Sequence, residues 1–290
     1  MNSMIVPFND LPPGSHRLIC RACGSDRRPK DKTLGVTIGA DGRAVAHCFR
    51  CGYVASHRPN HPHSVRPAFQ IRKEVLPVFG KPRHETLSDY GRAVWREQCH
   101  PILPGTIAAD YLLARRCVLP PVEGHLRWHP ALRHPSGYVG PALVGLVTDV
   151  VTRQFLSLHR TWIQADGRKA DVDPPRLLLG GHRKAGGCIR LWPDDAVTTG
   201  LAVAEGIETA LSLAHGYAPV WSLIDAGNLA ALPVLGGVEV LVIGADNDPA
   251  GRTAAEICAR RWSDADREVL VTRQQQNDLN DMLTEVAHDR

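Results

Sequence analysis

The sequence of 290 residues contains no long hydrophobic run. No apolar stretch approaches the roughly 20 residues that a membrane-spanning helix needs, and the first ten residues lack a basic segment followed by an apolar one. These absences argue against a membrane protein and a secreted protein, so we expect a soluble, cytoplasmic protein that makes no membrane contact. The pattern GxxxxGK[ST] is also missing, and the glycine-rich stretch at 180–187 does not match it, which argues against an ATP-hydrolysing motor in this chain.

Eight cysteines are present, and four of them form two CxxC pairs, Cys20–Cys23 and Cys48–Cys51. Two such turns supply the four thiolates of a tetrahedral structural Zn²⁺ site, whereas a redox dithiol needs only one pair in a βαβ context. His47 is an alternative ligand, but with four cysteines available we treat it as a neighbour. Because two strand-like segments, 33–38 and 43–48, flank a turn at 40–42 between the pairs, residues 1–56 are predicted to form a β zinc ribbon.

Positive charge is concentrated in the first part of the chain. Residues 1–84 contain 14 Lys and Arg against 5 Asp and Glu, whereas residues 85–290 contain 20 against 25. The excess of positive charge in residues 1–84 predicts that this part of the chain contacts a polyanion. The alternative is a basic surface that is merely solvated. Residues 57–84 are rich in Pro, His and Arg without periodicity, which predicts a flexible linker.

Residues 85–200 are predicted to form an α+β subdomain. Helical spacing of apolar residues covers 85–99 and 106–116, with Thr106 as the N-cap of the second helix. Strand patterns follow at 142–148, 155–163 and 175–180, separated by turn signals, and this alternation suits an antiparallel or mixed sheet.

Residues 201–290 alternate regularly between short apolar strands and helices, which predicts a parallel, three-layer α/β domain. Glu205 ends the first strand, and Asp246 and Asp248 follow the third, so three carboxylates should meet at one sheet edge and bind Mg²⁺. Glu205 is the candidate ligand or general base. Glu208 and Asp278 are further magnesium candidates, although acids at helix starts can simply favour the helix dipole. Capping of a helix is the alternative for Asp246 and Asp248, but it accounts for one acid rather than three.

The motif Glu205-Gly-Ile-Glu208 together with Asp246-Asn-Asp248-Pro-Ala-Gly251 resembles the Toprim domain of primases, topoisomerases and some nucleases. With the zinc ribbon in front, the chain resembles bacterial, phage and plasmid DNA primases, and the stretch from Arg160 to Leu191 resembles the segment that precedes their Toprim domain. The resemblance implies a Rossmann-like core, synthesis of RNA primers on single-stranded DNA, structural Zn and catalytic Mg or Mn. It also implies a replicative helicase supplied by another chain. The cations expected to bind nucleoside triphosphates and template are Arg160, Lys169, Arg183 and Lys184.

Other functions remain open at this point. A topoisomerase needs a tyrosine nucleophile on further large domains, and a Toprim nuclease of the type paired with an ATPase needs a motor that the sequence does not show. A non-catalytic alternative is a zinc-dependent factor that binds single-stranded DNA or loads replication proteins.

Overall fold

The computed structural model describes residues 8–20, 32–40, 42–48, 53–57, 84–272, 276 and 279–280. The chain divides into an N-terminal unit, Met1–Val78, and a C-terminal unit, Phe79–Arg290. Each is considered by itself. None of the described helices combines the length and the apolar character needed to cross a bilayer.

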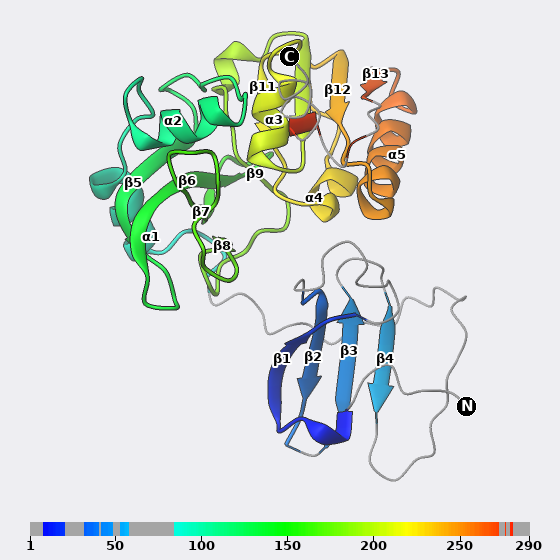
Figure 1. Ribbon diagram of the computed structural model, residues 1–290. Coiled ribbons are helices and arrows are strands. Elements are labelled where there is room, and N and C mark those ends of the chain that lie inside the picture. Colours follow the sequence, from blue (N-terminus) through cyan, green and yellow to red (C-terminus); the bar gives the residue numbers. More distant parts are fainter. Residues whose placement is uncertain are drawn as a thin grey trace. The chain divides into compact units, whose positions relative to one another are not determined.

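The N-terminal unit is an antiparallel sheet in the order β1-β2-β3-β4 (Figure 1). Side chains of β2 and β3 alternate between buried and more exposed positions, as expected for a sheet with one covered face. The two central strands match the strands predicted from the sequence, and the turn between them is closed by a hydrogen bond from Gly42 N–H to the Gly39 carbonyl, 3.0 Å. The elements are η1 (Phe8–Asp10), β1 (Gly14–Leu18), β2 (Leu34–Ile38), β3 (Ala44–Cys48) and β4 (Val54–His57).

The C-terminal unit begins with three short helical elements, which an antiparallel sheet follows in the order β5-β6-β7-β8, with β9 paired to β6. Thr106 caps α2, as predicted, by accepting a hydrogen bond from the Ala109 N–H, 3.2 Å. The elements are α1 (Asp89–Ala93), the π-helical turn η2 (Val94–Gln98), α2 (Ile107–Ala114), β5 (Leu126–Arg133), β6 (Val139–Asp149), β7 (Phe155–Trp162), β8 (Arg176–Leu178) and β9 (Gly187–Cys188).

Strand β5 is a strand that sequence patterns missed. Its interior contains Pro130, which cannot donate a hydrogen bond to the ladder, and the register with β6 shifts between His129 and Leu132. A proline inside a strand-like run argues against a strand in the sequence, but an edge strand tolerates it, and β5 lies at the edge of the sheet.

The parallel sheet predicted for the last ninety residues is confirmed, with strand order β11-β10-β12-β13. Beyond residue 272 the structure describes only residues 276 and 279–280, so the end of this domain lies largely outside the described residues. The elements are η3 (Asp194–Ala196), β10 (Gly200–Ala204), α3 (Ile207–Leu213), β11 (Val220–Ser222), α4 (Ala226–Ala231), β12 (Val240–Gly244), α5 (Pro249–Ser263) and β13 (Glu268–Val271).

The two sheets of the C-terminal unit share one hydrophobic core. Leu143 and Leu156 of the first sheet lie in the same buried cluster as Ile207 and Leu211 of α3. Main-chain hydrogen bonds between Ile189 and Ser222, 2.7 and 2.9 Å, also join the segment after β9 to β11. Residues on either side of position 200 therefore pack as one body.

Candidate active site

The acidic residues singled out in the sequence follow two neighbouring strands. Glu205 follows β10 directly, and Asp246 and Asp248 follow β12, which pairs with β10 in parallel from Gly200↔Val240 to Ala204↔Gly244. The carboxyl ends of paired parallel strands lie at the same edge of the sheet. The segments that lead from β10 into α3 and from β12 into α5 therefore lie side by side.

Gly251 allows these two segments to approach each other. A Cβ atom added at Gly251 would lie 3.0 Å from Oε1 of Glu205, 3.0 Å from Cβ of Asp246 and 2.6 Å from the Asp246 carbonyl oxygen. Contacts that short are not tolerated, so only glycine fits between the two acids at this turn. Asp248 caps α5, because its Oδ1 accepts a hydrogen bond of 2.8 Å from the Gly251 N–H.

Glu205 is the electrostatically unusual member of the group. Burial raises its pKa to about 8, and the negative charges of Asp246, Asp248 and Asp225 act in the same direction. Its Oε1 is buried and accepts no hydrogen bond within the described part of the chain. A carboxylate in this position needs either a proton or a cation.

Asp225 is a member of the group that sequence reasoning missed. It follows β11, the neighbour of β10 on the other side, and caps α4 through a 2.9 Å hydrogen bond from the Asn228 N–H. The signal was present in the sequence, because Asp225 directly follows a short, mostly apolar run at 219–224. The acidic edge therefore spans three adjacent strands rather than two.

The acid group fits a hard divalent cation. Within the described residues no set of three or more His, Cys, Asp or Glu side chains has the arrangement of a metal site, so the fit rests on Glu205 facing Asp246 and on the unsatisfied buried Oε1 of Glu205. Oxygen ligands with surplus negative charge are the ligands that Mg²⁺ and Mn²⁺ prefer.

Two of the predicted phosphate-binding cations lie close to this edge. Nζ of Lys184 contacts Oδ2 of Asp225 at 2.7 Å. The next residue back, Arg183, pairs with Asp149 at 2.8 Å, and although burial raises the Asp149 pKa, hydrogen bonds from Thr152, Arg183 and Val151 lower it to about 2. The turn that carries Arg183 and Lys184 is thus held between the β6–β7 hairpin and α4.

Glu208 is not brought to the magnesium group, and the expectation that it binds metal beside Glu205 is corrected. Its carboxylate is buried and accepts a 2.8 Å hydrogen bond from the Tyr111 hydroxyl, while Nζ of Lys169 lies 3.5 Å away. Burial opposes ionisation, but the charges of Lys169 and Arg176 hold the Glu208 pKa below its ordinary range. One helical turn separates Glu205 from Glu208, and the turn rotates the second side chain towards α2.

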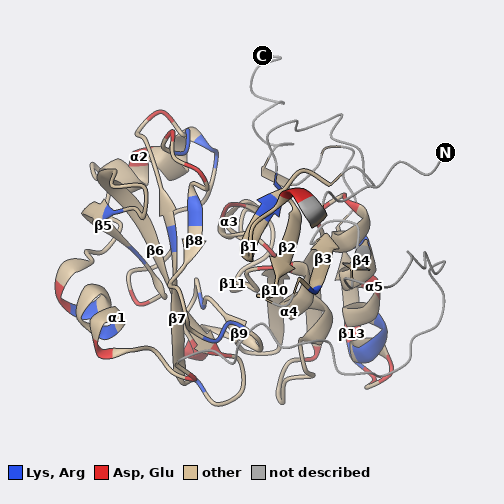
Figure 2. Cartoon of the chain, turned by 90° about the horizontal axis from the view of Figure 1, so that it is seen from below, with Lys and Arg blue, Asp and Glu red and all other residues tan. Residues whose placement is uncertain are grey.

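Lys169 and Arg160 lie on different faces of the first sheet. Burial lowers the pKa of Lys169, the charge of Glu208 opposes this shift, and Arg176 of β8 adds a further positive charge nearby. Arg160, in contrast, donates to the Leu178 carbonyl at 3.0 Å and stacks over Trp162, whose cluster includes residues around α1. Arg160 and Trp162 point to the same face of β7, because alternate residues of a strand share a face. Lys169 lies with Glu208 instead, so the structure does not bring Arg160 and Lys169 together. Figure 2 shows the basic residues on β8 and on α5.

Three of the predicted metal ligands lie outside the described residues: Asp278, Cys23 and Cys51. The other two cysteines of the proposed zinc site, Cys20 and Cys48, are both buried in the cluster between the strands of the N-terminal unit. The four-cysteine zinc site stays a prediction, because two of its ligands lie outside the described residues.

Comparison with known proteins divides the C-terminal unit into two parts. Residues 200–289 match a family model described as the Toprim domain, and residues 85–191 match one described as a domain of unknown function, DUF7146. No curated protein matches.

Solved structures similar to this chain include three primases. The primase fragment of the bacteriophage T7 primase-helicase is 16% identical, with 95% of this chain and 96% of that chain covered and a TM-score of 0.43. The zinc-binding and RNA polymerase domains of the Aquifex aeolicus primase are 15% identical, with coverage of 69% and 57% and a TM-score of 0.44. A DNA primase domain from Pseudomonas aeruginosa is 14% identical, with coverage of 67% and 70% and a TM-score of 0.38.

Residues 200–289 belong to the Toprim family. The parallel order of β10–β13 and the acids at the ends of β10 and β12 agree with the resemblance seen in the sequence.

Proposed function

We propose that this chain is a DNA primase, a DNA-templated RNA polymerase that makes short primers on single-stranded DNA. The observation that carries the proposal is the acidic edge of the Toprim domain, where Glu205, Asp246 and Asp248 meet and Oε1 of Glu205 is buried without a hydrogen bond. The two CxxC pairs and the basic residues before the Toprim domain favour primase over the other Toprim activities.

In this proposal Asp246, Asp248 and Glu205 hold divalent Mg or Mn ions. Such ions, when bound, stabilise negative charge on the attacking and leaving oxygens of a phosphoryl transfer. Without a bound ion the pKa of Glu205 is raised to about 8, and the alternative role of this residue is that of a general base. Asp225 adds negative charge to the edge and fixes the position of Lys184.

The proposed nucleotide-binding residues are Lys169, Arg183 and Lys184, joined by Arg176. Lys184 lies against Asp225 at the acidic edge, and Lys169 lies against Glu208 on α3, which begins directly after Glu205 and Gly206. Lys184 is the cation in direct contact with the acidic edge, and cations are what a triphosphate needs for charge balance beyond its metal ions.

The N-terminal unit is proposed to bind structural zinc through Cys20, Cys23, Cys48 and Cys51. A metal ion held by four thiolates replaces the large core that so small a unit cannot build. We further propose that this unit contacts template DNA and that a helicase, as in the primase-helicase named above, acts together with the chain.

Incubation with single-stranded DNA, ribonucleoside triphosphates and Mg²⁺ or Mn²⁺ tests the proposal by the appearance of short oligoribonucleotides. The Asp246→Ala variant should lose about 100-fold or more of this activity, because its carboxylate is a proposed metal ligand, while keeping its Tm and its affinity for DNA. Asp171→Ala, which removes an exposed carboxylate elsewhere in the same unit, is the matched control.

Other outcomes identify the alternatives. Binding of single-stranded DNA without any oligoribonucleotide would favour a non-catalytic loading factor. Shortening of the DNA in the presence of Mg²⁺ would favour a Toprim nuclease. Retained synthesis in Asp246→Ala would remove this residue from the metal site.

The zinc proposal has its own test. Cys48→Ser should release zinc, measured by a metal-binding dye, and should reduce initiation of new primers more than extension of a supplied primer. Equal loss of both activities would show that the metal supports folding alone.

A further inference from the structure

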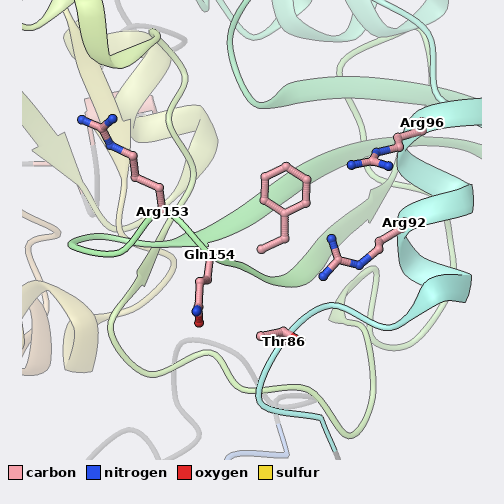
Figure 3. Close-up of a pocket in the computed structure, with 6 residues that line it drawn as sticks. Thr86, Arg92, Arg96, Arg153 and Gln154 are labelled. Carbon is pink, nitrogen blue, oxygen red and sulfur yellow. The ribbon is translucent and has the colours of Figure 1, made fainter.

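A basic pocket lies at the start of β7, apart from the acidic edge. Its volume is about 350 Å³, and three arginines contribute to its walls without any acidic lining residue (Figure 3). The arginines come from different elements: two from α1 and η2, and one from the turn between β6 and β7. The lining residues are Thr86, Arg92, Arg96, Arg153, Gln154 and Phe155.

The guanidinium groups are oriented by the protein but keep donors available. Nε of Arg92 donates to the Leu87 carbonyl at 3.0 Å, and Nε of Arg153 contacts Asp194 at 2.8 Å, so the terminal nitrogens of both remain for a ligand. Arg96 is exposed and makes no hydrogen bond or ion pair with the described residues. Figure 3 shows Arg92 and Arg96 on one side of the pocket and Arg153 on the other, with the Arg153 guanidinium pointing away from the other two, so the arginines are placed for separate phosphate groups.

An aromatic ring is added by a bulge in β7. Thr148 pairs with Phe155 and Val147 pairs with Ser157, so Leu156 has no partner opposite it. The extra residue turns Phe155 towards the cluster around α1, while Leu156 enters the core shared with the Toprim domain. The Arg92 guanidinium lies 5.7 Å from the centre of the Phe155 ring, which gives the pocket a flat surface beside its positive charges.

A second hollow lies beside the pocket, and its lining includes the acidic residues Glu85 and Asp89. This hollow has a volume of about 490 Å³, and it shares Thr86 and Arg92 with the pocket. Glu85 lines the hollow and lies 3.7 Å from Nε of Arg183, whose neighbour Lys184 contacts Asp225 at the acidic edge. The cations on this side of the unit, Arg183 and Lys184, are thus each paired with acidic side chains.

We propose that this pocket binds single-stranded nucleic acid, with phosphates on Arg92, Arg96 and Arg153 and a base against Phe155. Positive charge with an interleaved aromatic ring is the usual composition of a single-strand site. A strand is favoured over a free nucleotide because the arginines lie on two sides of the pocket, where they can contact separate phosphates of one strand. Insofar as the strand is the template of a primase, the inference rests on the proposed function.

Fluorescence anisotropy of labelled oligothymidylate with the full chain, without nucleoside triphosphates or added divalent metal, tests the pocket. The double variant Arg96→Gln/Arg153→Gln should bind about 10-fold more weakly and show a shallower dependence on salt, because two phosphate contacts are lost. Phe155→Leu should weaken binding about 5-fold with little change in the salt dependence. Arg133→Gln/Arg260→Gln removes the same charge from exposed positions outside the pocket and should change the affinity less than about 2-fold.

Equal affinities of the two double variants for oligothymidylate, when thermal unfolding curves show that both variants are folded, would overturn the proposal. An unchanged oligothymidylate affinity together with weaker binding of labelled ATP would assign the pocket to a free nucleotide and would also overturn it. Loss of strand binding in the pocket variants of a chain that makes no RNA would support the pocket and contradict the primase. RNA synthesis by the native chain, together with unchanged strand binding in the pocket variants, would support the primase and contradict the pocket.

Discussion

Glu205 is a residue whose ionised side chain lowers the stability of the folded protein, although the same side chain is proposed to serve its function. Its carboxyl group ionises near pH 4.3 in an unfolded chain, whereas burial and the neighbouring acids raise its pKa to about 8 in the folded chain. Folding stability therefore falls as the pH rises between these two values, because the folded state keeps a proton that the unfolded state has lost.

The variant Glu205→Gln should remove this pH-dependent loss. At pH 8 without divalent metal we expect its Tm to exceed that of the native chain by about 2–4 °C, corresponding to roughly 1 kcal/mol, and the difference should vanish near pH 4.5. Addition of Mg²⁺ at pH 8 should raise the Tm of the native chain and leave the variant unchanged. Thermal unfolding by circular dichroism measures both effects, and an equal Mg²⁺ response in the two proteins would place the ion elsewhere.

At the scale of elements, the buried group around Glu208 joins three segments that are distant in sequence. The Glu208 carboxylate on α3 accepts the hydroxyl of Tyr111 on α2 and pairs with Lys169, which bridges to Ile163 just after β7. Asn280 adds hydrogen bonds from its side chain to the Arg115 carbonyl, 2.6 Å, and to Ser212 Oγ, 3.1 Å. The cation proposed to bind triphosphate is thereby fixed to the helix that starts at the acidic edge.

Replacing Glu208 by Gln keeps an acceptor for Tyr111 but removes the charge opposite Lys169. Breaking a buried pair in this way costs about 3 kcal/mol, so the Tm should fall by roughly 6–12 °C at pH 7. Because the Glu208 pKa is lowered, its contribution is present above the unfolded pKa and is lost as the pH falls below it. The Tm difference should therefore shrink at acid pH.

Glu256→Gln is the control for this variant, since Glu256 is exposed on α5. It should leave the Tm unchanged. A Tm difference for Glu208→Gln that stays constant down to pH 3 would show that the loss comes from packing rather than charge.

At the scale of the molecule, the C-terminal unit is expected to unfold as one body although two family models divide it. Leu156 of the first sheet is fully buried in the cluster that also contains Ile207 and Leu211 of the Toprim domain. Residues before and after position 200 therefore depend on the same core, and their stability should be coupled.

Leu156→Ala tests this coupling. Loss of the side chain should cost about 3 kcal/mol and lower the Tm of the unit by roughly 6–12 °C, with hydrogen exchange accelerated in β10 as well as in β7. Val139→Ala, at a position that is 53% exposed, should have little effect. Faster exchange confined to the first sheet would show that the two parts unfold independently.

The sequence by itself determined the parallel sheet of the Toprim domain, the strands beside the CxxC pairs and the placement of Glu205, Asp246 and Asp248 at one edge. These features follow from local signals, since an apolar strand that ends in acid and glycine defines both the element and the position of its functional side chains. Side-chain direction was decided by the tertiary structure alone. Contacts with other elements turned Glu208 towards Tyr111 and buried Arg160 against Trp162, and one unpaired residue in β7 turned Phe155 towards the cluster around α1. No local pattern in the sequence records which distant side chains will lie opposite.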